Sequence, residues 1–494
     1  MNNLPVTKAI NWSVFTENST IQTVLTAAGV VNCDVFLVGG AVRDFLLTGR
    51  ISEDLDFIVL NGSAERLAKY LSGALNRKCI VLDAGWGIFR IVTRDNITLD
   101  LANALNNNLD DDLKRRDLTV NAIALDLKVQ RIIDPCAGYT HLQENVIAMV
   151  SAQTFQADPL RLLRVFRFAA QLNAKAITPE TLEAVSQNKD RLWTVSGERI
   201  QTEFFKLLSI TPCFSALKQL ADCGLLDVLL PELVPMKAIE PSGFHHLNLY
   251  THSLELVFQC ERLMLDSLDS SDSKHQATQT VDEVALLGLK NWVSQPVGGC
   301  YSRLGLIKFA CLLHDIGKPA TKGSRPDPVY GERLTFYNHE KVGADMAQDI
   351  LDRLKVSHEI RLLVTKLIRW HLYPCQFSSS SAERSLLRFY RKMGKDTLDL
   401  LLLAMADRYS TAGPWVSEET IQGAIKNYSW LINNYLALKP VIDLPPLLNG
   451  REIMSLLKMG PGPEIGTIIN ELKEAQLSGE IETAEEAKKW ILAL

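Results

Sequence analysis

The first third of the chain carries short apolar runs separated by turn residues, which is the pattern of buried strands. Five runs show this pattern, at residues 34–38, 54–60, 88–94, 97–103 and 120–127. The first run ends at Gly39 and Gly40, and the residues after this pair have helical spacing. The pattern predicts a head with a small sheet over residues 1–150, of the α/β or α+β class.

From residue 158 onward the apolar positions follow a helical period. In DPLRLLRVFRFAAQL the side chains of Leu162, Val165, Phe166 and Ala169 fall on one stripe, as in an amphipathic helix. The whole chain is therefore predicted to be α+β, with a mostly helical body after the head. The predicted parts of the body are a helical neck at 151–235, a helical domain at 236–440 with a flexible insertion near 266–300, and a helical tail at 441–494.

Composition narrows the class of protein only modestly. A chain of 494 residues is too long for one hydrophobic core, so several domains are expected. No apolar run reaches the ~18 residues that a membrane helix needs. The N-terminal residues also lack the basic and apolar regions of a secretory signal, so a cytoplasmic enzyme without membrane contact is expected. Nine scattered cysteines without a CxxC pair favour free thiols over disulfides or a zinc site.

The charge balance neither predicts nor excludes a nucleic-acid partner. A net charge of −5 gives no basic signature for the chain as a whole. Phosphate groups are bound by local patches, however, and arginines cluster at 115–116 and again at 161–167. These two clusters are candidates for contacts with phosphate.

A glycine turn and paired aspartates carry the first candidate chemistry. Gly39 and Gly40 precede a helix that contains Arg43, and a helix N-terminus favours bound phosphate, although an ordinary tight turn uses the same residues. Asp54 and Asp56 lie two apart on a predicted strand, so their carboxylates point to the same face.

Such adjacent charges repel each other unless a cation lies between them, and Mg²⁺ prefers oxygen ligands. Asp100 on a neighbouring strand offers a third carboxylate. The alternative for these carboxylates is a solvated strand edge, but their order after a glycine turn favours a two-metal site for nucleotidyl transfer.

These segments resemble a known family. LVGGAVRDFLL (37–47) and DLDFIVL (54–60) are similar to the nucleotidyltransferase signature of the polymerase-β superfamily. RRDLTVNAIALD (115–126), DPLRLLRVFRFAAQL (158–172) and SGERIQTEFFKLL (196–208) resemble further motifs of the class II CCA-adding enzymes and bacterial poly(A) polymerases. The ordered motifs cover residues 30–210, and their combination is highly specific.

The resemblance implies a role for each matching residue. Asp54 and Asp56 would hold the metal ions, and Asp117 would read the ribose 2′-hydroxyl. The triphosphate would be held by Gly39, Gly40 and Arg43, the ribose and phosphates would be contacted by Arg116 and Asp117 with the support of Asn121, and the base would be read by Asp158 and Arg161. Arg164 and Arg167 continue the helical face of Arg161 and are candidates for binding phosphate.

The pair Asp158 and Arg161 also has a chemical logic of its own. Three residues apart on a helix, the two side chains would share a face. Aspartate accepts from an exocyclic amine, and arginine donates to a ring acceptor. Cytosine and adenine present this combination, whereas uracil and guanine present the reverse. The alternative is that Asp158 caps the helix and the arginines are exposed.

Two features depart from the family pattern. Ala157 stands where the family usually has a glutamate, which places the orientation of Arg161 in question. Only fourteen residues separate Asp100 from Arg115, where full CCA-adding members carry a longer flexible loop that helps to switch the pocket from CTP to ATP. The short segment resembles the CC-adding subclass. Full CCA addition, A addition alone and poly(A) synthesis remain alternatives.

A second set of residues lies in the helical body. LLHDIGKP (312–319) contains adjacent His314 and Asp315. This pattern resembles the HD superfamily of metal-dependent phosphohydrolases, in which imidazoles and carboxylates from several helices hold divalent metals. The implied ligands are His252, His314, Asp315, His339, His371 and Asp407. A structural or regulatory HD domain is as compatible with this pattern as an active phosphohydrolase.

Three hypotheses follow for the whole chain. The leading one is a nucleotidyltransferase that uses Mg²⁺ and CTP, with ATP as the alternative donor, on the 3′ end of tRNA. Its partners are tRNA and nucleotide, and no obligate protein partner is evident. The second is a phosphohydrolase with a second divalent metal in the HD domain and a vestigial head. The third, a non-catalytic RNA-binding module, does not explain two converging carboxylates.

Overall fold

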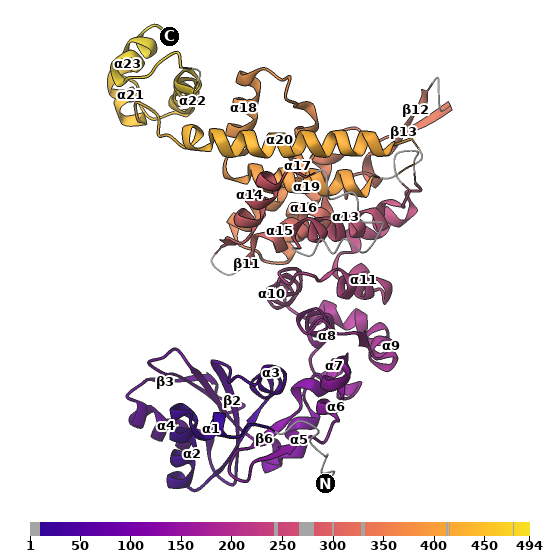
Figure 1. The fold of residues 1–494 in the computed structure, drawn as a ribbon, viewed down its shortest axis with the longest axis vertical. Helices are drawn as coiled ribbons and strands as arrows, with labels where there is room; N and C mark the ends of the chain where they lie inside the picture. The colour runs from indigo at the N-terminus through magenta and orange to yellow at the C-terminus, as the bar shows by residue number, and fades with distance from the viewer. Residues whose placement is uncertain are drawn as a thin grey trace. The chain divides into compact units, whose positions relative to one another are not determined.

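The structure is a computed structural model that describes residues 10–241, 246–265, 281–298, 301–327, 331–411, 413, 415–477 and 479–494. It divides into two compact units, Met1–Leu229 and Leu230–Leu494. The first contains the sheet, and the second is built mainly of helices (Figure 1). This arrangement confirms the predicted α+β class.

A seven-stranded mixed sheet lies in the first unit, in the order β3-β4-β5-β2-β1-β6-β7. Strands β2 and β5 are parallel, and all other neighbouring pairs are antiparallel. Each of the five predicted runs contains one strand, whereas β3 and β7 are additional strands at the two edges. The strands are β1 (Asp34–Val38), β2 (Asp54–Leu60), β3 (Cys79–Asp83), β4 (Ile88–Val92), β5 (Thr98–Asn103), β6 (Ala124–Asp126) and β7 (Arg131–Ile133).

The alternation along β2 separates the two faces of the sheet. Leu55 and Phe57 are buried in the larger core of this unit, together with α2 (Ser19–Val31), α3 (Gly40–Thr48) and α4 (Ala64–Leu75). Ile58 faces the other side, where a smaller core includes two leucines of α5 (Leu109–Lys114). Because strand side chains alternate, Asp54 and Asp56 lie on the Ile58 face. The sheet thus places these carboxylates opposite its main core.

Helices that follow the sheet complete the first unit. The predicted amphipathic stripe lies on α8 (Arg161–Gln171), and its apolar residues Leu162, Val165, Phe166 and Ala169 are all buried. The shorter α7 (Gln153–Ala157) precedes α8, and α10 (Gly197–Leu208) packs against α8. The apolar stripe on α8 fixes this helix in the unit, and its arginines are left on the opposite face.

The second unit packs helices around α15 (Arg303–Leu313) and α19 (Thr397–Ser410). Every residue of α15 is buried, which explains its nearly continuous apolar sequence. These two helices contact α13 (Leu249–Met264) and α17 (His358–Trp370), and α16 (His339–Arg353) packs on α17. The long α20 (Glu418–Ile442) also contacts α19 (Figure 1). No helix within the described residues is long and apolar enough to cross a bilayer.

Two segments of the second unit bear on the predicted organisation. Residues 266–280 of the predicted insertion lie outside the described residues, but α14 (Glu283–Val293) is a regular helix. The expectation of a flexible insertion through residue 300 is therefore wrong for this helix, because its Leu289 and Val293 are buried. Toward the C-terminus, α21 (Gly450–Leu457), α22 (Pro463–Leu477) and α23 (Ala484–Leu492) share a hydrophobic core of their own.

Candidate functional site

The glycine turn brings the backbone close to two predicted site residues. Strand β1 ends at Val38, and Gly39 has φ of 72° and ψ of −136°, a conformation that only glycine adopts readily. A Cβ on Gly39 would lie 2.9 Å from Nη1 of Arg116 and 3.3 Å from Oδ2 of Asp56. Glycine is therefore required here for both backbone conformation and space.

Replacing Gly39 by alanine is expected to lower the free energy of unfolding by roughly 1–3 kcal/mol and to reduce nucleotide binding, because the added methyl crowds Arg116. Gly49→Ala is the matched control, since Gly49 also has φ of 72° but nothing lies within 4 Å of its Cβ position. Denaturant unfolding measures both variants. Equal losses of stability with unchanged nucleotide binding would contradict the crowding argument.

The carboxylates of the head lie on adjacent parallel strands. Asp56 on β2 is directly opposite Asp100 on β5, and Asp54 is two residues before Asp56. Burial raises the pKa of Asp56, and the nearby Asp100 and Asp54 raise it further, whereas Arg116 lowers it. A cation would relieve this concentration of negative charge. The oxygen donors of Asp54 and Asp56 therefore fit a hard divalent metal such as Mg²⁺.

Asp100, the predicted third carboxylate, forms an ion pair with an arginine of the neighbouring strand. Arg90 on β4 donates from Nε to Oδ1 at 2.8 Å and from Nη2 to Oδ2 at 2.7 Å, so both oxygens of Asp100 are engaged. Each of these oxygens accepts one hydrogen bond from Arg90 and keeps a further lone pair that a metal could use. Asp100 thus stays a predicted third carboxylate, and β4 supplies a cationic partner for it that sequence order did not reveal.

One cavity of about 440 Å³ brings the predicted nucleotide-binding residues together. All ten line it, although they come from the turn after β1, α3, the 115–121 segment, the bend between α7 and α8, and α8 itself. Asp56 lines it as well, whereas Asp54 and Asp100 do not. The cavity residues are Gly39, Gly40, Arg43, Asp56, Arg116, Asp117, Asn121, Asp158, Leu160, Arg161, Arg164, Arg167, Phe168, Gln171 and Arg199.

A buried hydrogen-bond chain crosses this cavity. Nη1 of Arg43 donates to Oδ1 of Asn121 at 2.6 Å, and Nδ2 of Asn121 donates to Asp117 at 3.2 Å. Nε of Arg164 donates to Oδ2 of Asp117 at 2.6 Å. Burial raises the pKa of Asp117, but Arg164 and the hydrogen bonds outweigh it, so the pKa lies below its usual value. Asp117 is therefore held as a carboxylate, able to accept from a hydroxyl.

Sequence reasoning missed two residues that shape this cavity. Arg199 on α10 donates from Nη2 to both oxygens of Asp158, at 3.1 and 2.9 Å. The ring of Phe168 supports the guanidinium groups of Arg43, Arg164 and Arg167, at 5.0, 5.4 and 4.0 Å from its centroid. Arg199 lies within the quoted SGERIQTEFFKLL segment, but nothing local to that segment indicates its partner.

The predicted helical face shared by Asp158 and Arg161 is not formed. Asp158 has extended backbone with φ of −146° and ψ of 100°, and α8 begins only at Arg161. Proline follows Asp158 and disfavours helical backbone in the residue before it, which is the physical reason. Both side chains nevertheless line the same cavity. The two groups converge through the bend between α7 and α8 and not through helical spacing.

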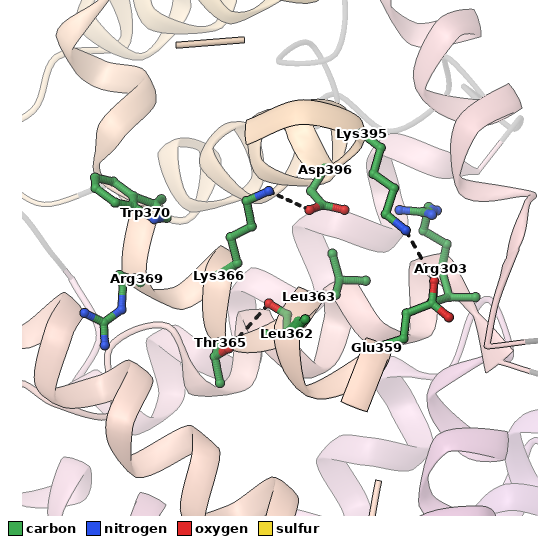
Figure 2. A pocket seen from close by; sticks show the side chains of 11 residues that line it. Arg303, Glu359, Leu362, Leu363, Thr365, Lys366, Arg369, Trp370, Lys395 and Asp396 are labelled. Atoms are coloured by element: carbon green, nitrogen blue, oxygen red, sulfur yellow. Dashed lines mark hydrogen bonds and ion pairs between the residues drawn. The ribbon is translucent and has the colours of Figure 1, made fainter. Parts of the chain in front are cut away.

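The charge of this cavity suits a polyphosphate. Six arginines line it against three carboxylates, so cations are in excess. A cavity of about 400 Å³ in the second unit also has more cations than carboxylates, but more apolar residues line it (Figure 2). There Lys366 donates to Asp396 at 2.8 Å and Lys395 to Glu359 at 3.3 Å, above apolar residues such as Leu362 and Leu363. That cavity contains none of the predicted site residues.

The predicted HD residues form two adjacent groups in the second unit. His252, His314 and Asp407 form one, and Asp315, His339 and His371 form the other; within each group the candidate ligand atoms lie within 4.8 Å of one another. His314 and Asp315 connect the groups, with Nε2 of His314 3.1 Å from Oδ2 of Asp315. Lys318 also contacts Asp315, at 2.5 Å.

The backbone fixes which nitrogen three of these histidines present. Nδ1 of His314, His339 and His371 lies 2.9, 2.7 and 2.7 Å from carbonyl oxygens of Cys311, Phe336 and Ile368. A carbonyl only accepts, so Nδ1 carries the proton and Nε2 is free to bind a metal.

Protonation and burial in this cluster also suit a metal. Burial, followed by the charges of His314 and His339, lowers the pKa of His371 to about 3, which keeps this imidazole neutral. Nε2 of His314 and Oδ1 of Asp315 are buried without a hydrogen bond of good geometry within the described chain. The neutral imidazole of His371, beside the buried carboxylates and the other histidines of the cluster, fits one or two divalent metals.

Comparison with known sequence families finds three matches along the chain. Residues 35–148 match the poly A polymerase head domain, and residues 176–237 match the probable RNA and SrmB-binding site of polymerase A. Residues 249–412 match the HD domain. The first match contains Asp54 and Asp56, and the third contains all six predicted HD ligands.

Similar proteins match the chain over nearly its full length. The A-adding tRNA nucleotidyltransferase of Deinococcus radiodurans is 32% identical, over 92% of this chain and 94% of that protein. The CC-adding tRNA nucleotidyltransferase of Thermus thermophilus is 32% identical, over 93% of each. In fold, the chain resembles the Thermotoga maritima CCA-adding enzyme solved in complex with tRNA, with a TM-score of 0.61, 19% identity and 98% coverage of both chains.

Proposed function

Because the chain belongs to the tRNA nucleotidyltransferase family, we propose that it adds CMP from CTP to the 3′ end of tRNA without a nucleic-acid template. The observation that carries the proposal is the cavity in which all ten predicted nucleotide-binding residues meet Asp56. Its excess of arginine matches a triphosphate, and Asp56 in its wall, with Asp54 two residues earlier on β2, matches the metal that accompanies one.

Different residues of the cavity bind different parts of the nucleotide. Arg43 and Arg116, beside the glycine turn, neutralise the triphosphate, and Asp117 accepts from the ribose 2′-hydroxyl. When held by Asp54 and Asp56, Mg²⁺ supplies activation of the tRNA 3′-hydroxyl and neutralisation of the leaving pyrophosphate. The protein groups place the α-phosphate in line with that hydroxyl, which is the main requirement of phosphoryl transfer.

Asp158 and Arg161 select the base through hydrogen bonds. Oδ2 of Asp158 accepts only from Arg199 among the described residues, which leaves a lone pair for an exocyclic amine. The Arg161 guanidinium donates to the ring nitrogen beside that amine. Cytosine and adenine satisfy both groups. Uracil and guanine would place a carbonyl against Asp158 and a ring N–H against Arg161, leaving both groups unpaired at a cost of about 1–3 kcal/mol each.

The segment between Asp100 and Arg115 supports CC addition over full CCA addition. It contains the end of β5, a short 3₁₀ turn at Leu105–Asn107 and α5, whose Leu109 and Leu113 are buried. The carboxylate of Asp112 is also buried and holds Arg115 at 2.8 Å. A segment packed in this way has little freedom to reshape the pocket from CTP to ATP. The 32% identity to both a CC-adding and an A-adding relative keeps A addition as the alternative outcome.

Sequencing of the product ends tests the proposal. Transfer RNA acceptors that lack the terminal nucleotides are incubated with the full-length chain and with CTP, ATP or both. We expect two cytidines to be added from CTP and no further extension from the mixture. Adenosine added only to acceptors ending in CC would instead identify an A-adding enzyme, and no incorporation of either nucleotide would refute nucleotidyl transfer.

A second activity is favoured by the geometry of the HD cluster. The two groups of ligands, with Nε2 of three histidines oriented by backbone carbonyls, suit a divalent metal that activates water. We propose hydrolysis of phosphomonoesters or 2′,3′-cyclic phosphates by this cluster.

A further inference from the structure

Ala157 raises the question of what orients Arg161. Arg164 and Arg167 form ion pairs with Asp117 and Glu203, both at 2.6 Å. Arg161 forms no ion pair with any described residue, and alanine at position 157 offers no carboxylate. If the Arg161 side chain were mobile in the free protein, binding of a base would immobilise it, and the lost conformational entropy would weaken binding. Another group has to fix it.

Two neutral oxygens hold the Arg161 guanidinium. Its Nη1 donates to the carbonyl oxygen of Arg115 at 2.7 Å and to Oγ1 of Thr154. The Thr154 hydroxyl itself donates to the carbonyl oxygen of Arg116 at 3.1 Å. Its single proton is therefore committed to Arg116, and its lone pair faces Arg161. The polarity of this hydrogen-bond chain is fixed.

Thr154 is well placed to orient both base-reading residues. It is buried, with 4% of its surface exposed, and its backbone carbonyl accepts from the amide of Asp158 at 3.1 Å. Through its hydroxyl it holds Arg161, and through its carbonyl it holds the bend that carries Asp158. The link to Arg116 also joins base reading to the segment that contacts the triphosphate and ribose.

Neutral partners leave the charge of Arg161 available. A glutamate would bind the guanidinium and cancel its charge, whereas a hydroxyl and a carbonyl orient it without doing so. Nε and Nη2 of Arg161 form no hydrogen bond within the described chain, and the residue lines the cavity. Two donors thus remain for the acceptor nitrogen and carbonyl of cytosine.

We propose that Thr154 is a specificity-determining positioning residue that, with the Arg115 carbonyl, takes the place of a carboxylate at position 157. This role rests on the proposed nucleotidyltransferase function. It predicts that selection of cytosine over uracil depends on one buried hydroxyl that contacts no substrate.

The test compares Thr154→Val with a matched control. Valine keeps the branched shape of threonine and replaces its hydroxyl with a methyl group, which cannot form the hydrogen bond. Thr181→Val is the control, because Thr181 is also buried and its hydroxyl accepts from the Met149 amide at 2.9 Å, outside the cavity. We expect Thr154→Val to lower the ratio of CMP to UMP incorporation by roughly 10- to 100-fold, as for loss of a hydrogen bond to a charged group. The KM for CTP should rise while the KM for tRNA does not change, and Thr181→Val should keep the wild-type ratio.

A double variant connects the effect to Arg161. Adding Ala157→Glu to Thr154→Val supplies a carboxylate and should restore discrimination against UTP. A wild-type CMP to UMP ratio in Thr154→Val, or loss that Ala157→Glu does not restore, would overturn the proposal. Calorimetric binding of CTP and UTP to the same variants gives the ratio without any transfer. A chain that incorporates no nucleotide would therefore refute the proposed function, while the binding ratio still decides the role of Thr154.

Discussion

Asp54→Ala and Asp56→Asn are each expected to abolish nucleotide incorporation into tRNA, with a loss of at least about 10³-fold in rate. Metal ions contribute several kcal/mol to transition-state stabilisation, and each ~1.4 kcal/mol is a factor of ten. Asp56 is mostly buried beside Asp54 and Asp100, so removing one carboxylate lowers repulsion in the free protein. The variants should therefore fold and still bind tRNA. Radiolabelled CTP incorporation and tRNA binding are the two measurements.

A charge control separates a metal site from a general electrostatic effect. Asp95 is exposed in the turn between β4 and β5, near the same sheet but outside the cavity. Asp95→Asn should leave incorporation and thermal stability close to wild type. If Asp54→Ala and Asp95→Asn gave the same activity, the two carboxylates of β2 would not form a metal site. A variant that lost tRNA binding as well would indicate misfolding, which thermal denaturation detects.

His314→Ala is expected to remove any phosphohydrolase activity and to leave nucleotide incorporation near wild type. His314 is 1% exposed and lies 3.1 Å from Asp315 and 3.8 Å from Asp407, so its loss disrupts both groups of ligands. Catalytic metals are sensitive to single ligands, and a loss of at least about 10²-fold is expected. Hydrolysis of a chromogenic phosphomonoester with added divalent metals measures the activity.

His358→Ala is the matched control, since His358 begins α17 at an exposed position outside the cluster. It should retain full hydrolysis and full incorporation. Loss of both activities in His314→Ala would show that the substitution acts through folding of the second unit. Retention of hydrolysis in His314→Ala would contradict a metal centre at these residues. Metal content measured on the purified variants gives an independent readout.

Local periodicity determined a large part of this protein before any tertiary contact was known. Period-two alternation placed Asp54 and Asp56 on one face of β2, because side chains of a strand alternate whatever its neighbours are. Helical spacing identified the buried stripe of α8 in the same way. The motif residues of the cavity and the six HD residues were predicted from the resemblance of their sequence segments to known families, and the structure brings each set together.

Tertiary structure alone decided which partners these residues have. Arg199 binds Asp158, which lies 41 residues earlier in the chain, and Arg90 on β4 forms an ion pair with Asp100 on β5. Neither contact follows from spacing within one segment. The extended backbone at Asp158 replaced the helical face expected from three-residue spacing. Thr154 acquired its place beside Arg161 only because α7 and α8 meet at a bend. Periodicity fixes the side to which a residue points, whereas packing between distant segments fixes what it meets there.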